Sequence, residues 1–121
     1  MATLGNNVFD KGLSYLATNG TRLDICSSEP ATYAAVAGVS LGNKTGLSIS
    51  APGNRTGGGR KVTVAQITDG SVTATGTATH YAITNGSNEL LATGSLAAPQ
   101  AVTSGNTFTL ASFDIGIPAP A

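Results

Sequence analysis

Residues 60–93 read RKVTVAQITDGSVTATGTATHYAITNGSNELLAT, and this stretch decides the fold class. Apolar and polar residues alternate over residues 61–68 and again over residues 71–79, which is the period of a half-buried β-strand. Between these two runs stands Asp69-Gly70, a typical two-residue hairpin turn. The stretch therefore predicts a β-hairpin.

The second of these strands has two chemically different faces. Alternation places threonines on one face and small residues on the other, and small side chains allow another layer of backbone to approach closely. Because threonine has a high β-propensity, we interpret the threonine face as a solvated surface. The threonines are Thr73, Thr75, Thr77 and Thr79, and the small residues are Val72, Ala74, Gly76 and Ala78.

A second hairpin is predicted directly downstream. Residues 80–84 and 89–93 flank the turn Asn85-Gly86-Ser87-Asn88, and the pattern places Tyr81 and Ile83 in the core.

A last strand pair is predicted from residues 100–103 and 107–117, around a turn at Ser104-Gly105-Asn106. The apolar residues of the second run change phase, so we expect a bulge near Ala111-Ser112 that restores it.

The first twenty residues have a helical period instead. We expect a short amphipathic helix over residues 7–18, capped by Asn6 or Asn7 and stopped by a left-handed turn at Asn19-Gly20. Gly12 costs about 1 kcal/mol relative to alanine, so the helix should form only when its apolar face is packed. The apolar residues are Leu4, Val8, Phe9, Leu13 and Leu16.

Residues 21–26, TRLDIC, predict the first strand. Leu23 and Ile25 should face the core, Asp24 should lie on the strand exterior, and Cys26 should act as a small buried hydrophobe.

A long segment rich in Ala, Gly, Ser and Asn follows at residues 31–59. It contains two short candidate strands, at residues 33–39 and 47–50. Long loops inside a domain are usually functional or disordered, so we expect this segment to be an interaction arm.

Together the elements predict one domain over residues 1–121. The expected class is mainly β, an antiparallel β-sandwich or small barrel of six to eight short strands with one short N-terminal amphipathic helix. Its parts are the helix within residues 1–20, the arm 31–59, a β-hairpin core at 60–117 and an extended tail at 118–121.

The charge balance bears on the choice of partners. The chain has six Lys and Arg, six Asp and Glu, no net charge and a pI near 6.5, so electrostatic binding to nucleic acid is disfavoured. Charged residues make up only 10% of the chain, which favours association over solitary solubility.

No window approaches 18 consecutive apolar residues, so no membrane partner is expected. The single cysteine and the lack of a signal-like start point to synthesis in a reducing cytoplasm.

The sequence offers little chemistry for catalysis. His80 is the one histidine, and neither CxxC nor HxxxH spacing occurs, so we expect no metal and no cofactor. A Cys26–His80 pair for nucleophilic catalysis is formally possible, but a buried structural cysteine is the favoured interpretation. The carboxylates have local explanations in a helix first turn at Asp10, in turns and on strand exteriors.

The run Gly57-Gly58-Gly59-Arg60-Lys61 resembles a phosphate-binding loop only superficially. A Walker loop requires Ser or Thr after the lysine and a helix beyond it, whereas Val62 and a strand follow here. We interpret the run as a flexible joint that leaves Arg55, Arg60 and Lys61 available for carboxylates on a neighbour.

Six stretches spread over nearly the full chain carry a family resemblance. The stretches are Phe9-Asp10-Lys11-Gly12-Leu13, Leu23-Asp24-Ile25-Cys26-Ser27-Ser28-Glu29-Pro30, Gly58-Gly59-Arg60 before Val62-Thr63-Val64, Ala78-Thr79-His80-Tyr81-Ala82-Ile83, Leu90-Leu91-Ala92-Thr93-Gly94, and Val102-Thr103-Ser104-Gly105-Asn106-Thr107-Phe108. In them the chain resembles small virion proteins of tailed bacteriophages. The resemblance implies a β-rich phage structural protein, and the closest role is that of small capsid decoration proteins, which bind capsids as trimers or other clusters.

The expected function is therefore a non-enzymatic capsid decoration or cement protein that binds the assembled head and ties neighbouring capsomers together. Its expected partners are the major capsid protein, other virion proteins and copies of itself, and its expected place is the head surface after synthesis in the host bacterial cytoplasm. The candidate interface residues are Val8, Phe9, Leu13, Tyr33, Arg55, Arg60, Lys61 and Pro118.

Two other functions remain open from the sequence. In the first, the protein is a tail, neck or fibre component whose hairpin tips bind a receptor or a neighbouring protein. These tips lack the aromatic residues that sugar-binding sites usually expose. In the second, which we favour least, it is a hydrolase that uses Cys26 and His80.

Overall fold

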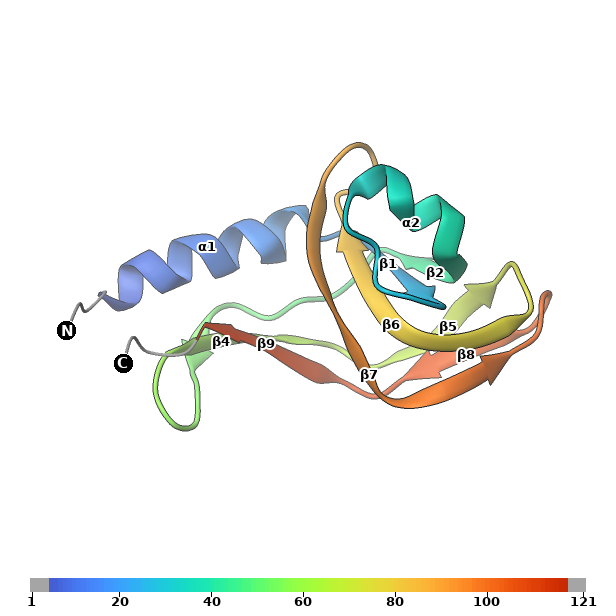
Figure 1. Ribbon diagram of the computed structural model, residues 1–121. Coiled ribbons are helices and arrows are strands. Elements are labelled where there is room, and N and C mark those ends of the chain that lie inside the picture. Colours follow the sequence, from blue (N-terminus) through green and yellow to red (C-terminus); the bar gives the residue numbers. More distant parts are fainter. Residues whose placement is uncertain (1–4, 118–121) are drawn as a thin grey trace.

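The computed structural model describes residues 5–117, and its elements form two antiparallel sheets and two helices (Figure 1). The strand order is β7-β6-β1-β2-β5-β8 in a six-stranded sheet and β3-β4-β9 in a three-stranded sheet. The elements are α1 (Asn6–Asn19), β1 (Arg22–Cys26), α2 (Tyr33–Val39), β2 (Ser40–Thr45), β3 (Gly53–Asn54), β4 (Arg60–Val64), β5 (Ile67–Val72), β6 (Gly76–Thr84), β7 (Leu90–Val102), β8 (Thr107–Leu110) and β9 (Phe113–Ile117).

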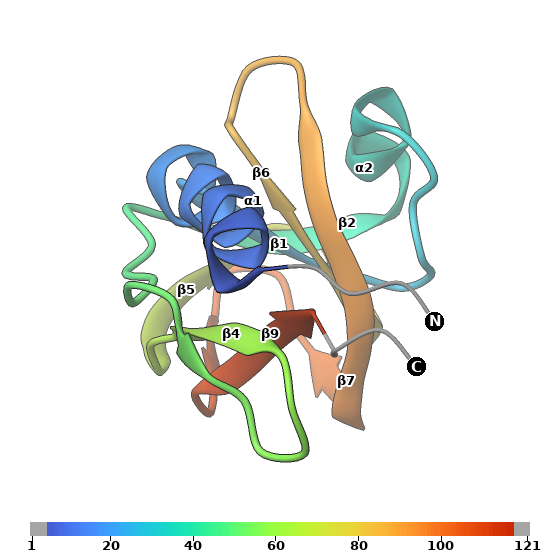
Figure 2. The same ribbon diagram turned by 90° about the vertical axis from the view of Figure 1, so that its left-hand side faces the viewer.

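The six-stranded sheet curls into a half-barrel, and the long strand β7 runs along one side of the molecule (Figure 2). The predicted class, a mainly β antiparallel protein with an N-terminal helix, is confirmed. Strands β7 and β8 are the two edges of the curled sheet, so in the described chain each pairs with a neighbouring strand of that sheet on one side only.

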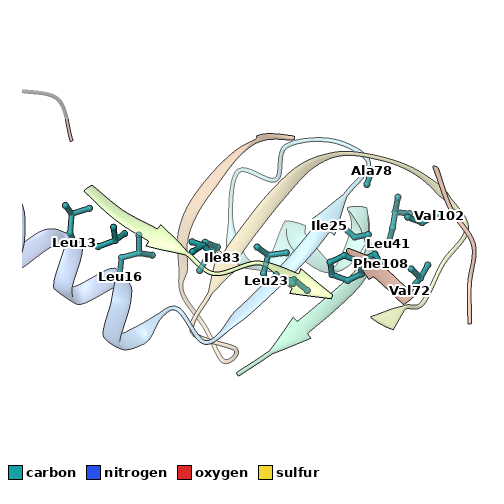
Figure 3. Packing of buried hydrophobic residues seen from close by; sticks show 13 residues of the cluster. Leu13, Leu16, Leu23, Ile25, Leu41, Val72, Ala78, Ile83, Val102 and Phe108 are labelled. Carbon is teal, nitrogen blue, oxygen red and sulfur yellow. The ribbon is translucent and has the colours of Figure 1, made fainter. Parts of the chain in front are cut away.

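The main core fills the concave side of the half-barrel and continues towards α1 (Figure 3). Leu23 and Ile25 are fully buried there, as the alternation of residues 21–26 predicts. Phe108 is the largest fully buried side chain, which makes β8 essential to a core with few aromatic residues. The other members are Leu13, Leu16, Leu41, Val62, Val64, Ile67, Val72, Ala78, Ile83 and Val102.

Helix α1 confirms the predicted N-terminal helix, although its two ends differ from expectation. Gly5 rather than an asparagine is the N-cap, without a side-chain hydrogen bond. Gly20 ends the helix at φ −77°, so the predicted left-handed stop is wrong. Glycine is needed for space instead, because a Cβ there would lie 2.7 Å from the carbonyl oxygen of Leu16.

The prediction of a strand at residues 33–39 is wrong, because this segment is helix α2. Thr32 caps it, with its side-chain oxygen accepting a hydrogen bond from the backbone N–H of Ala35 at 3.2 Å. Val36 then packs against Cys26 and Ala82 in a small second core. Short apolar runs have no period that separates helix from strand, which explains the error.

The segment 31–59 is therefore not a free arm. Strand β2, which the sequence did not predict, lies within it and pairs with both β1 and β5 in the middle of the sheet. The candidate strand at residues 47–50 is reduced to one bridge between Ile49 and Val64.

The predicted hairpin turn at Asp69-Gly70 is also wrong, because both residues lie inside β5. Strands β4 and β5 belong to different sheets and do not pair with each other. Gly70 stands directly opposite Phe108 of β8, and a Cβ on Gly70 would overlap the Phe108 ring. Close packing, not turn geometry, therefore requires this glycine.

The second hairpin is confirmed, since β6 and β7 pair across a turn at residues 85–89. The last predicted pair is wrong: the end of β7 pairs with the start of β6, whereas β8 pairs with β5 and β9 with β4. The phase change at Ala111-Ser112 marks the passage of the chain from one sheet to the other, not a bulge.

The two faces predicted for residues 72–79 are confirmed. Thr73, Thr75 and Thr77 are exposed, whereas Val72 and Ala78 are buried.

Candidate functional site

A cavity with both polar and apolar walls lies between α2 and the outer face of the curled sheet. We call this cavity, of about 460 Å³, the α2 pocket. Residues of β1 alternate between the main core and this outer face, so Arg22, Asp24 and Cys26 all lie on the side of α2. The pocket is lined by Arg22, Asp24, Tyr33, Ala34, Val36, Ala37, Ser40, Asn43, Thr73 and Thr84.

An ion pair between a buried aspartate and a partly exposed arginine forms part of the pocket wall. Nε and Nη2 of Arg22 donate to the two carboxylate oxygens of Asp24 at 2.9 and 3.2 Å. The Ser40 hydroxyl donates to Oδ2 of Asp24 at 2.7 Å. Asp24 is only 1% exposed, so its predicted position on a solvated strand exterior is wrong. This site could not be predicted from the sequence, because the helix α2 that covers this face was itself not predicted.

Cys26 and His80 are brought together, directly opposite each other on β1 and β6. The Cys26 side chain is nevertheless fully buried, and burial, followed by the nearby charge of Asp24, raises the pKa of its thiol to about 12. The ring Nδ1 of His80 lies 2.9 Å from the Thr79 hydroxyl. Cys26 therefore fills space in the small core beside α2, and the thiolate that a nucleophile needs is suppressed.

We expect Cys26 to resist alkylation in the folded protein. A thiol with a pKa near 12 holds about a thousandfold less thiolate at neutral pH than one at 9.0, and burial also blocks access. Iodoacetamide labelling followed by mass spectrometry should show no modification until urea unfolds the chain. A Ser87→Cys variant, whose added thiol stands in an exposed turn, should gain one label while folded. Rapid labelling of wild-type Cys26 would contradict this account.

The candidate interface residues of α1 have different environments. Val8 is 57% exposed, but Phe9 and Leu13 are 4% and 3% exposed and belong to the interior. Phe9 and Leu13 are therefore not available as interface residues, since their burial within the chain provides the packing that the helix needs. Tyr33 is half-buried in the α2 pocket. Pro118 lies outside the described residues.

The predicted basic residues lie close together near β4, but two of them already have partners. Arg60 donates from Nε and Nη2 to the carboxylate of Asp10, at 2.8 and 3.2 Å, and so ties α1 to β4. Lys61 pairs with Asp114 of β9 at 2.8 Å. Arg55 donates to the carbonyl oxygen of Gly58 at 3.0 Å. The prediction that Arg60 and Lys61 are free for a neighbour's carboxylates is therefore wrong.

Two exposed carboxylates are likewise engaged within the chain. Hydrogen bonds from Lys61 and Thr63 lower the pKa of Asp114 below its usual value. Lys44 lowers the pKa of Asp69 in the same way. Many of the few charged side chains of this protein are thus paired with each other.

The half-barrel has two free edges, on β7 and β8, which the sequence pattern did not predict. The facing parts of β7 and β8–β9 border a groove of about 450 Å³, whose apolar lining includes Leu96, Leu110 and Phe113. The Gln100 side chain reaches across and donates to the carbonyl oxygen of Thr109 at 3.2 Å. A sequence signal for this arrangement is the stretch 90–102, LLATGSLAAPQAV, which contains no charged residue and is longer than the predicted partner strand at residues 80–84.

Among residues 5–117, no group of three or more His, Cys, Asp or Glu side chains is placed to hold a metal ion. Neither α1 nor α2 has the length and apolar character of a membrane-crossing helix. In comparisons with known proteins, the chain matches no family model, no curated protein and no solved structure.

Proposed function

We propose that this protein is a non-enzymatic capsid decoration or cement protein of a tailed bacteriophage, which binds the assembled head and bridges neighbouring capsomers. The sequence resemblance to small phage virion proteins suggests the role. The structural observation that supports it best is the unpaired edge of β7, a strand of 13 residues. Exposed strand edges offer backbone donors and acceptors to a strand of another protein.

The distribution of charge supports binding to a protein shell. Four ion pairs within the described chain engage Arg22, Lys44, Arg60 and Lys61. Beside the free edge, Ala97 and Ala98 are exposed and uncharged, and the nearby Asp114 is paired with Lys61. A contact through such an edge depends on main-chain hydrogen bonds and modest apolar burial. Many copies on one lattice, clustered as trimers or other oligomers, would then gain avidity from individually weak contacts.

The proposal predicts saturable cosedimentation of the purified protein with emptied, undecorated phage heads. Lysine at Ala97 and Ala98 places two charges beside the β7 edge, so the Ala97→Lys/Ala98→Lys variant should bind heads about tenfold more weakly or worse. Ala65→Lys, at an exposed position between β4 and β5, is the matched control and should bind like wild type. Undiminished binding by the double variant would overturn the β7 edge as the contact, and no binding to heads would overturn the function.

A tail, neck or fibre role is the alternative, favoured by the rigid turn between β6 and β7. Oδ1 of Asn85 accepts hydrogen bonds from the backbone N–H groups of Ser87, Asn88 and Glu89, at 2.9 to 3.0 Å. Such a turn presents a fixed surface to a partner. Cosedimentation with isolated tails alone, reduced by Ser87→Lys, would support this alternative and contradict the head assignment.

A further inference from the structure

The α2 pocket contains polar groups that the protein itself does not use. Within residues 5–117, the hydrogen bonds of the structure leave Nη1 of Arg22, the side-chain amide of Asn43 and the hydroxyl of Tyr33 without a protein partner. All three residues line the same cavity, although they come from β1, β2 and α2. A few convergent polar groups beside apolar residues, here Ala34, Val36 and Ala37, are typical of a small-molecule site.

The charge of the pocket favours a neutral ligand. Arg22 and Asp24 are the two charged residues in its lining, and they neutralise each other at 2.9 Å. An anion that approached Arg22 would also meet the carboxylate of Asp24, and a cation drawn to Asp24 would meet the guanidinium. A ligand with hydroxyl or amide groups avoids both penalties.

The Arg22–Asp24 pair and the start of α2 are held in place before any ligand arrives. Arg22 uses its Nε–Nη2 side for Asp24, which fixes the guanidinium plane and leaves Nη1 as a donor. Asp24 is fixed in turn by Ser40. Tyr33 stands in the first turn of α2, whose start is set by the Thr32 cap. Preorganisation of this kind lowers the entropy that binding must overcome.

We propose that the α2 pocket binds a single neutral sugar residue. Its hydroxyls would accept hydrogen bonds from Nη1 of Arg22 and exchange hydrogen bonds with the Asn43 amide, which offers both donors and an acceptor. One C–H face of the sugar would pack on the ring of Tyr33, an amphipathic side chain suited to a half-wet site. The cavity volume of about 460 Å³ lies within the range of small-molecule sites. This inference does not depend on the proposed virion role.

An NMR titration of the full chain tests the proposal. The probes are glucose, galactose, mannose and N-acetylglucosamine, with acetate and phosphate in separate samples. At least one sugar should produce saturable shifts in the Asn43 side-chain amide and the Arg22 Nε–H signals, and acetate and phosphate should bind at least about tenfold more weakly. Absence of such shifts with all four sugars, or tighter binding of either anion, would overturn the proposal.

Matched variants assign the binding to this pocket. Asn43→Ala and Tyr33→Ala should each weaken sugar binding about tenfold. Asn106→Ala and Tyr15→Ala remove the same chemical groups from exposed positions outside the pocket and should leave binding unchanged. Tyr33→Phe removes only the hydroxyl and preserves the ring, so it should retain part of the affinity. Comparison with Tyr33→Ala therefore distinguishes the loss of a contact with the sugar from a disturbance of α2. If the pocket variants bind like the controls, the site is wrong.

Discussion

Gly70→Ala is expected to destabilise the protein by about 3 kcal/mol, at the upper end of the usual cost of overpacking a core. Gly70 of β5 stands opposite Phe108 of β8, and the aromatic ring lies over the glycine where a Cβ would have to go. Phe108 is 2% exposed and closely surrounded, so its ring cannot turn into solvent. Urea unfolding followed by circular dichroism should show a lower midpoint with a similar slope.

Two further variants separate overpacking from other effects of the added methyl group. Gly38→Ala places it in α2, where no atom lies within 4 Å of the new Cβ, and should be neutral or stabilising by up to about 1 kcal/mol. Phe108→Leu combined with Gly70→Ala should cost less than the sum of the single changes, because the smaller side chain vacates the space. Equal stability of Gly70→Ala and wild type would contradict the packing described here.

Arg22→Ala is expected to cost about 3 kcal/mol, because it leaves the Asp24 carboxylate buried without its counter-charge. Asp24 is 1% exposed, whereas the Arg22 side chain is 37% exposed. The two halves of the pair are therefore not equivalent. An arginine deprived of its partner can be hydrated, but an aspartate deprived of its partner cannot, so Asp24→Ala should cost less than Arg22→Ala.

The decisive comparison is with the double variant. Arg22→Ala/Asp24→Ala removes both charges and should be more stable than Arg22→Ala alone, as measured by urea unfolding of all three variants. Lys44→Ala is the surface control, since it breaks the pair with the 68% exposed Asp69 and should change stability little. A double variant less stable than Arg22→Ala would contradict the asymmetry in burial.

Local sequence patterns were sufficient to predict an element and its buried residues where one face of that element packs on the core. The period of three to four residues found α1, and alternation placed Leu23 and Ile25 inside and Thr73, Thr75 and Thr77 outside. These predictions depend only on each element having a single buried side. They required no knowledge of which strand lies next to which.

Predictions failed where tertiary contacts override a local signal. Asp69-Gly70 has the composition of a turn, but it lies within β5, where Gly70 pairs with Phe108 of β8, 38 positions later in the chain. The α2 pocket could not be predicted from the sequence for a related reason. Asp24 stands at a position that alternation assigns to solvent, and it is buried because α2 covers that face of the sheet. Only the three-dimensional arrangement brings Arg22, Tyr33 and Asn43 to one cavity.

The pairing of β5 with β8 has a consequence for the chain during its synthesis. Val72 and Thr107, at the facing ends of these strands, are 35 positions apart in the sequence (107 − 72). At roughly 5–20 residues per second, the ribosome needs a few seconds to extend the chain from one to the other. During that interval, the side of β5 that faces β8 has no strand to pair with, and Phe108 has not yet been made. The nascent chain thus passes through a stage at which an unpaired edge and an incomplete core are exposed together, a combination that makes a chain prone to aggregate and dependent on chaperones.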